Sequence, residues 1–201
     1  MNRDFLRFGN ASADARLILL HGWGADAEDL MPLGEELISL INKDVELVSL
    51  RAPEAHPEGI GRQWYGLFPA KWSSVPSAIR ILQSRIKSFS SESIGLEKTI
   101  LLGFSQGGAM AISAGCDMPL RGIISCSGYI HPGWKPPKER PPIFLTHGTE
   151  DQVVPVAAAR QILNNFDGNK SYLDGYFFKG GHEIPLDAIR KISYILSSWL
   201  T

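Results

Sequence analysis

The sequence predicts an α/β protein with a mostly parallel sheet of about seven strands and helices on both faces. Short, continuous aliphatic runs recur along the chain, a pattern typical of strands that are buried on both sides. Amphipathic helical segments separate these runs, which favours right-handed crossovers between parallel strands. Sheets of this kind bind ligands at the carboxyl ends of their strands. We therefore expect functional residues in the loops that follow the aliphatic runs.

The composition is that of an ordinary globular protein. The 201 residues are 44% hydrophobic and 20% charged, with a formal net charge of -1, which suits a single domain spanning residues 1–201. Because there is no basic run, we expect neither nucleic acid nor an anionic membrane surface as a partner. No apolar segment is long enough for a membrane span, and the N-terminus lacks the apolar core of a signal peptide, so we expect a cytoplasmic protein. We expect the two cysteines, Cys116 and Cys126, to be buried apolar residues and not a disulfide.

The first half of the chain is expected to begin with an edge strand, because residues 3–8 alternate polar and apolar side chains. Continuous aliphatic runs at 17–20 and 45–50 predict two buried strands. Leucines at helical spacing predict a helix between them, from about 28 to 42, and a second apolar stripe predicts a helix over about 76–90.

The segment 51–74 is a long connection, rich in Pro and Gly. Loops of this length in a compact domain are usually functional or disordered. Four aromatic residues argue against disorder: Trp64, Tyr65, Phe68 and Trp72. We expect these four side chains to form an apolar wall for a substrate, and the alternative is that they pack the loop onto the body of the protein.

The second half continues the alternation to the C-terminus. An aliphatic run at 100–102 predicts a buried strand, followed by a helix that extends to Cys116. The remaining predicted elements are strands at 123–127, 143–146 and 172–178 and helices at about 156–166 and 185–200. We find no internal repeat and no linker, which again favours one domain.

Gly103-Phe104-Ser105-Gln106-Gly107 stands between this central strand and its helix, and it matches the Gly-x-Ser-x-Gly nucleophile elbow. The serine of such a turn is held in a strained backbone conformation, in which side chains two positions away would collide with the neighbouring strand and helix. The turn also places Ser105 at a helix N-terminus, where a developing negative charge is stabilised. The alternative is a glycine-rich turn that merely connects a strand to a helix.

Two more chemically active residues follow predicted strands, namely Asp151 and His182. The order Ser105, Asp151, His182 is that of the α/β-hydrolase fold. In that arrangement the serine is the nucleophile, the histidine takes its proton and later returns it to the leaving group, and the aspartate holds the imidazole in the right tautomer. We therefore predict these three residues as a catalytic triad.

Other residues compete for these roles. Glu150 is a second candidate for the acid, and the alternative role for Asp151 is a turn or helix-capping carboxylate. His21 and His147 also follow strands, but neither comes after the acid as the fold requires, so we expect them to bond to loop backbone.

Acyl transfer also needs hydrogen-bond donors for the oxyanion of the tetrahedral intermediate. We predict the backbone N–H groups of Gln106, directly after the nucleophile, and of Trp23, in the loop after the 17–20 strand. The alternative is that Gly22 and Gly24 serve only a tight turn.

Four motifs together resemble the acyl-protein thioesterase / bacterial carboxylesterase family, also called phospholipase/carboxylesterase. They are Leu-His-Gly-Trp-Gly-Ala-Asp at 20–26, Gly-Phe-Ser-Gln-Gly-Gly at 103–108, His-Gly-Thr-Glu-Asp-Gln-Val-Val-Pro at 147–155 and Gly-His-Glu-Ile at 181–184. The resemblance runs over nearly the whole chain. It implies the same triad, the same oxyanion-hole amides, no large lid domain and no cofactor or metal.

The chain departs from the family pattern in two places. Gly66 stands in Gln63-Trp64-Tyr65-Gly66 where the family usually has an aspartate, and Trp23 stands where a smaller aliphatic residue is common. The indole beside the oxyanion hole is expected to reshape acyl selectivity.

These observations predict a serine hydrolase that cleaves a small-molecule ester or acyl thioester, or an acylated protein, through an acyl-enzyme. Sequence does not separate an acyl-protein thioesterase from a small-ester carboxylesterase. A lactone hydrolase of the same fold would favour a cysteine at the elbow, where this chain has Ser105. A non-catalytic ligand-binding module on the same scaffold is the alternative from another class, and a homodimer through loops at the sheet edge is left open.

Overall fold

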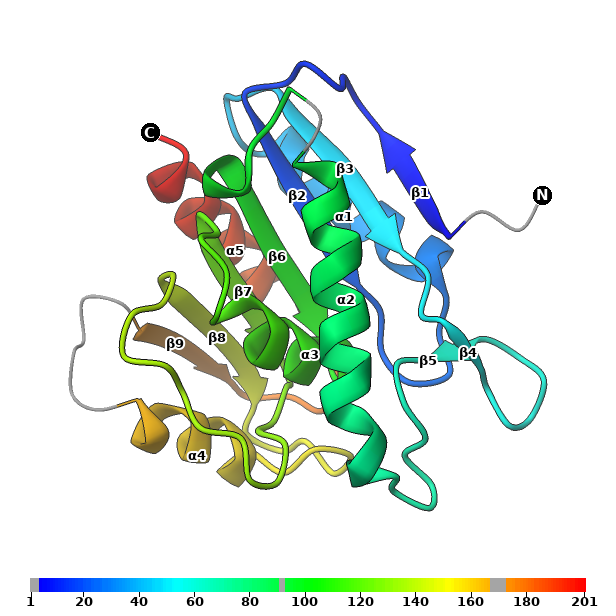
Figure 1. Ribbon diagram of the computed structural model, residues 1–201. Coiled ribbons are helices and arrows are strands. Elements are labelled where there is room, and N and C mark those ends of the chain that lie inside the picture. The colour runs from blue at the N-terminus through cyan, green and yellow to red at the C-terminus, as the bar shows by residue number, and fades with distance from the viewer. Residues whose placement is uncertain (1–3, 91–92, 167–172) are drawn as a thin grey trace.

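A computed structural model describes residues 4–90, 93–166 and 173–201 of the protein, and Figure 1 shows its architecture. Seven strands form one sheet in the order β1-β3-β2-β6-β7-β8-β9. Within this sheet β1 pairs antiparallel with β3 at the edge, and the other neighbouring strands that the structure describes are parallel. The predicted mostly parallel sheet is thereby confirmed. The strands are β1 Phe5–Phe8, β2 Ala15–Leu20, β3 Val45–Leu50, β6 Thr99–Phe104, β7 Gly122–Cys126, β8 Ile143–Gly148 and β9 Leu173–Phe178.

Helices cover both faces of this sheet (Figure 1). Alternate residues of β2 face opposite sides: Ile18 and Leu20 lie in the core with α2, α3 and α4, whereas Leu17 and Leu19 lie in the core with α1 and α5. This period of two is what a strand buried on both sides requires. The helices are α1 Met31–Ser39, α2 Val75–Phe89, α3 Gln106–Gly115, α4 Ala157–Asn165 and α5 Leu186–Trp199.

The predicted helix at 28–42 is shorter and is divided in two. A 3₁₀ turn, η1 Ala27–Leu30, comes first, and Asp26 caps it by accepting a hydrogen bond from the Ala27 N–H. The α-helix α1 then starts with Pro32 in its first turn, where a missing N–H is tolerated, and ends at Ser39. The leucine spacing therefore located the helix correctly but did not show its internal boundary.

The long segment 51–74 contains a small antiparallel hairpin, β4 Glu54–Ala55 with β5 Arg62–Gln63, and a 3₁₀ turn, η2 Trp72–Ser74. Backbone hydrogen bonds attach this hairpin to the turn after β2, from the Gly24 N–H to the Arg62 oxygen (2.9 Å) and from the Arg62 N–H to the Ala25 oxygen (2.8 Å). Sequence alone did not predict the hairpin, because strands of two residues carry no periodic signal.

The remaining predicted elements lie within a residue or two of their expected bounds. A third short 3₁₀ helix, η3 Leu96–Lys98, precedes β6. The last strand was predicted to start at Tyr172, which lies outside the described residues, and β9 is described from Leu173. Cys116 and Cys126 are buried free thiols, as predicted. No helix in the described part of the chain is long and apolar enough to cross a membrane.

Candidate active site

Ser105 occupies the sharp turn between β6 and α3. Its backbone angles are φ 55° and ψ -117°, a positive φ that non-glycine residues rarely adopt. The Ser105 N–H donates to the Cys126 oxygen of β7 at 2.8 Å, which fixes the turn to the neighbouring strand. This strain is typical of a residue whose side chain must be held at a functional position.

The glycines around Ser105 are required by close backbone contacts. A Cβ at Gly103 would lie 2.1 Å from the Gly107 oxygen, and a Cβ at Gly107 would lie 2.0 Å from the Leu20 oxygen. Real Cβ atoms do not approach backbone this closely. The collisions expected from the sequence motif are therefore present on both the helix side and the strand side of the elbow.

Asp151 and His182 are hydrogen-bonded to each other, from the His182 Nδ1 to the Asp151 Oδ2 at 2.7 Å. The other carboxylate oxygen accepts hydrogen bonds from the N–H groups of Val153 (2.9 Å) and Val154 (2.8 Å). Burial acts to raise the pKa of Asp151, but the hydrogen bonds from His182, Val154 and Val153 outweigh it, so the net pKa lies below its ordinary value. An ionised carboxylate only accepts, so Nδ1 carries the proton and Nε2 is the basic nitrogen.

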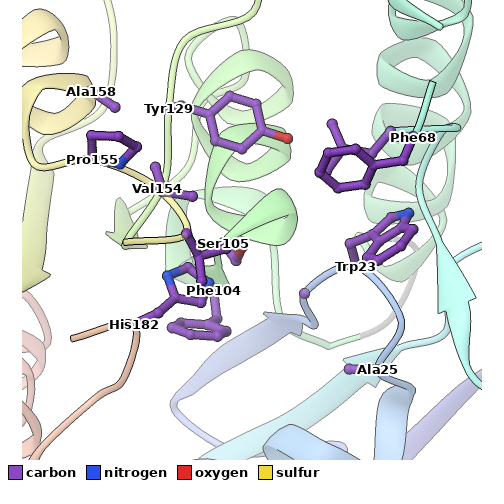
Figure 2. Close-up of a pocket in the computed structure, with 13 residues that line it drawn as sticks. Trp23, Ala25, Phe68, Phe104, Ser105, Tyr129, Val154, Pro155, Ala158 and His182 are labelled. Carbon is purple, nitrogen blue, oxygen red and sulfur yellow. The ribbon is translucent and has the colours of Figure 1, made fainter. Parts of the chain in front are cut away.

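His182 reaches the elbow by packing on Phe104, the residue before Ser105. The two ring centroids are 4.7 Å apart, and both rings line the same pocket as Ser105 (Figure 2). The side chain of His182 is 17% exposed, whereas that of Asp151 is fully buried. The structure thus brings the predicted nucleophile, base and acid to one edge of the sheet.

The competing residues have other partners. Glu150 is exposed, and the acid that bonds to His182 is Asp151. His147 lies buried with its Nε2 2.7 Å from the Val154 oxygen and 3.5 Å from the Asp151 carboxylate, so it fastens the loop that carries the acid. His21 bonds through Nδ1 to the Gly22 oxygen and through Nε2 to the Ala52 N–H, and burial lowers its pKa. Both histidines bond to loop backbone, as predicted.

Two backbone amides near the elbow are the oxyanion-hole candidates. Gln106 is the first residue of α3, where the N–H has no intrahelical acceptor. Trp23 lies in the turn after β2, and its backbone N–H has no acceptor among the described residues, whereas the next two amides, of Gly24 and Ala25, bond to Arg62 and Gly22. The Gly22 position lies against Ser105, since a Cβ there would be 3.5 Å from the serine Cβ.

A pocket of about 460 Å³ opens in front of Ser105 and His182 (Figure 2). Most of its wall is apolar, which suits an acyl chain. The residues that line it are Gly22, Trp23, Ala25, Leu67, Phe68, Phe104, Ser105, Tyr129, Val153, Val154, Pro155, Ala158 and His182.

Of the four aromatic residues predicted to bind substrate, Phe68 lines this pocket, and it is 71% exposed at the rim. Trp64 and Tyr65 are buried behind the pocket, where the Gln106 side chain bonds to the Trp64 N–H (3.0 Å) and the Tyr65 oxygen (2.8 Å). Trp72 contacts the Tyr65 ring and is not among the lining residues. The structure therefore gives Trp64 and Tyr65 the packing role that was the alternative in the sequence analysis.

The indole of Trp23 forms one wall of the pocket. Its Nε1 donates to the Gln63 Oε1 at 2.9 Å, and its ring packs edge-on against His56 and Phe68 at 4.1 and 5.1 Å. The hairpin thus holds in place the bulky side chain by which this chain departs from the family pattern. At the other departure, a Cβ on Gly66 would meet the Lys71 side chain at 3.0 Å.

Sequence reasoning missed several lining residues. Val153, Val154 and Pro155 belong to the motif that carries Asp151, and their place beside the acid was a usable signal. Tyr129 follows the predicted strand at 123–127 and so lies at the carboxyl edge where ligands are expected. In the described part of the chain, no group of three or more His, Cys, Asp or Glu side chains is arranged to hold a metal ion.

Comparison with known proteins gives consistent matches over the chain. A family model described as Phospholipase/Carboxylesterase matches residues 4–200. Acyl-protein thioesterase 1 of Yarrowia lipolytica is 26% identical over 167 residues, 72% of either chain. The crystal structure of esterase PE8 is 27% identical, with a TM-score of 0.85 over 96% of this chain and 97% of its own. Acyl-protein thioesterase 2 of Zea mays, at 17% identity and a TM-score of 0.76 over 98% and 99% of the two chains, shows the shared fold.

Proposed function

The chain belongs to the phospholipase/carboxylesterase family of α/β-hydrolases, and on that premise we propose that it hydrolyses carboxylic esters or acyl thioesters through an acyl-enzyme formed on Ser105. His182 is the general base and acid, and Asp151 orients it. The observation that carries the proposal is the His182–Asp151 hydrogen bond of 2.7 Å at the pocket lined by the strained Ser105. The N–H groups of Trp23 and Gln106 form the oxyanion hole.

In the first half of the reaction, the Ser105 Oγ attacks the carbonyl carbon while His182 Nε2 accepts the serine proton. The negative charge that develops on the carbonyl oxygen is stabilised by the two backbone amides and by the N-terminus of α3. His182 then returns the proton to the departing alcohol or thiol. Water repeats the sequence on the acyl-enzyme and releases the acid.

Asp151 contributes by staying ionised. Its lowered pKa keeps the carboxylate charged at neutral pH, so that it accepts from Nδ1–H and leaves Nε2 free to take a proton. It also stabilises the imidazolium that forms during each transfer. The N–H groups of Val153 and Val154 hold the carboxylate in that orientation.

The acyl group is proposed to lie in the apolar pocket between Trp23, Phe68 and the 153–155 segment. A second candidate function is an acyl-protein thioesterase, which the similarity to the Yarrowia lipolytica protein favours. Phe68 and Val153, 71% and 68% exposed, stand at the rim, so a chain attached to a large carrier can reach the serine from the surface. The single domain, the homodimer and the cytoplasmic location stay predictions.

The test uses purified protein and p-nitrophenyl esters of increasing acyl length, together with a fatty-acyl thioester. We expect hydrolysis that Ser105→Ala abolishes, and labelling of Ser105 by a fluorophosphonate probe. The chain-length optimum and the ester-to-thioester ratio separate the carboxylesterase from the acyl-protein thioesterase. A folded protein that neither turns over nor labels contradicts the proposal and favours a ligand-binding module.

A further inference from the structure

A chain of buried hydrogen bonds runs from the inside of α3 to the proposed acyl pocket. The Ser113 Oγ lies 2.7 Å from the His131 Nδ1, the His131 Nε2 lies 2.8 Å from the Tyr65 hydroxyl, and that hydroxyl lies 2.6 Å from the Tyr129 hydroxyl. Ser113, His131 and Tyr65 are 1%, 2% and 0% exposed. Tyr129, the last member, lines the pocket in front of Ser105.

We call this series of hydrogen bonds, from Ser113 through His131 and Tyr65 to Tyr129, the relay. The direction in which its members donate is fixed at the Ser113 end. Among the described residues, the only hydrogen-bond partner of the Ser113 hydroxyl is the His131 Nδ1, so its proton must point there to be paired. A buried hydroxyl whose proton has no acceptor is costly, and such groups are rare in folded proteins. His131 Nδ1 is therefore the acceptor, and the ring proton is on Nε2.

The donor and acceptor roles of Tyr65 and Tyr129 in the relay follow from the neutral state of His131. Burial lowers the pKa of His131 to about 4, so at neutral pH the ring has one N–H group, on Nε2. That group donates to the Tyr65 oxygen, and the Tyr65 O–H then donates to the Tyr129 oxygen. The proton of Tyr129 is not used within the relay, and it is left for the pocket.

Tyr129 is placed to use that proton. Figure 2 shows its hydroxyl directed across the pocket, toward the side on which Phe68 lies, and away from Val154 and Pro155. Apart from Tyr129, Ser105 and His182, the side chains that line this pocket are apolar. The polar Nε1 of Trp23 is bonded to Gln63. A single donor in an apolar wall discriminates strongly, because a substrate without an acceptor leaves it unpaired.

Resting on the function proposed above, we propose that the Tyr129 hydroxyl donates a hydrogen bond to an acceptor oxygen on the acyl chain. The preferred substrates are then acyl groups that carry an ether, carbonyl or hydroxyl oxygen, over all-carbon chains of equal length. Tyr129 is the specificity-determining residue, and the neutral His131 directs its proton through Tyr65.

The experiment compares p-nitrophenyl hexanoate with the propoxyacetate, ethoxypropanoate and methoxybutanoate esters, which move one ether oxygen along a chain of constant length. Each kcat/KM is divided by the rate of hydroxide hydrolysis, since an oxygen near the carbonyl activates the ester. We expect at least one ether ester to be preferred over hexanoate by roughly tenfold, and Tyr129→Phe to remove that preference. The matched control, Tyr194→Phe, alters an exposed tyrosine on α5 and should keep it.

The direction of the relay is read from the imidazole itself. In 15N-labelled protein, the chemical shifts of the two ring nitrogens of His131 distinguish the protonated from the unprotonated nitrogen, and we expect the proton on Nε2. Ser113→Ala leaves Nδ1 without a donor, but a proton moved to Nδ1 would have no acceptor, whereas on Nε2 it still bonds to Tyr65, so we expect the same tautomer and the same ether preference. A proton found on Nδ1 in the unaltered protein overturns the direction of the relay.

The outcomes separate this inference from the function on which it rests. If the protein hydrolyses the esters but Tyr129→Phe leaves the preference unchanged, or His131 carries its proton on Nδ1, the inference is wrong and the hydrolase remains. If no ester is hydrolysed, the same comparison is made by calorimetry on Ser105→Ala, with ketones in which a methylene replaces the ester oxygen. Equal affinity for the ether and all-carbon ketones overturns the inference independently of turnover.

Discussion

Two histidines at the same edge of the sheet differ in their hydrogen-bond partners and in their exposure to solvent. His182 bonds to the carboxylate of Asp151 and is 17% exposed at the pocket, whereas His131 bonds to the hydroxyls of Ser113 and Tyr65 and is 2% exposed. Burial among neutral partners opposes protonation of an imidazole, and it lowers the pKa of His131 to about 4. His131 therefore stays neutral, whereas His182 lies at the pocket beside a carboxylate that can stabilise the imidazolium formed in the proposed reaction.

The largest expected effect on kcat comes from replacing His182, the proposed catalytic base. His182→Gln removes the base, and we expect kcat to fall by about 10⁴-fold or more. His131→Gln is the matched substitution in the other network, and we expect it to lower kcat by less than about tenfold, because His131 touches no reacting atom. Steady-state kinetics on one ester measure both. Equal losses in the two variants would show that the networks do not differ in role.

Asp151→Asn keeps the shape of the acid but changes the tautomer of the base. The amide would donate to His182 Nδ1, which moves the ring proton to Nε2 and leaves no acceptor for the serine proton. We expect kcat to fall by about 10⁴-fold with little change in fold. Glu150→Gln, at the exposed neighbour, is the control and should keep nearly full activity. Loss of activity in Glu150→Gln instead would reassign the acid.

The hydrogen bonds around His131 and those around Asp151 should affect the free energy of unfolding in different pH ranges. The folded-state pKa of His131 is lowered to about 4, so between about pH 6.5 and 4 the unfolded chain binds a proton that the folded chain does not. Stability is therefore lost as the pH falls through this range, by an amount on the order of 3 kcal/mol. His131→Gln should show a flatter dependence in urea unfolding, with the contribution of His21 common to both proteins.

Asp151 acts at lower pH. Its pKa is lowered in the folded state, so its contribution to stability is complete above the ordinary aspartate pKa of about 4 and is lost as the pH falls through the folded value. The stability difference between the protein and Asp151→Asn should accordingly be constant from pH 7 to about 5 and shrink only below that range. A difference that shrinks already near pH 6 would contradict the lowered pKa.

The smallest effect interrupts the relay at its centre. Tyr65→Phe removes the hydroxyl between His131 and Tyr129 and leaves the His131 N–H unpaired in the core. We expect a loss of about 1–3 kcal/mol in the free energy of unfolding, measured by urea denaturation. Tyr194→Phe, 72% exposed, should change stability by less than about 0.5 kcal/mol. A neutral Tyr65→Phe variant would mean that the buried hydroxyl contributes no net stabilisation.

The sequence determined the fold class of the protein and the order of its strands and helices along the chain. Aliphatic runs and helical leucine spacing are local signals, and they predicted the seven-stranded sheet and its layers. Parallel strands also end at one edge, so residues after different strands, such as Ser105, Asp151 and His182, are gathered there by topology alone. That is why a serine, an aspartate and a histidine far apart in the chain could be predicted as neighbours.

Tertiary structure decided what surrounds these residues. Phe68 lines the pocket, whereas Trp64 is held away from it by two hydrogen bonds that it donates, from its backbone N–H to the Gln106 side chain and from its Nε1 to the His21 oxygen. These bonds join positions 42 and 43 residues apart. The relay from Ser113 to Tyr129 likewise joins a helix interior, a loop and a strand end. Such pairings depend on where side chains meet after packing, and no periodicity in the sequence encodes them. The sequence by itself thus determined the candidate reacting groups, and packing decided which side chains line the pocket and which hydroxyl groups are joined behind it.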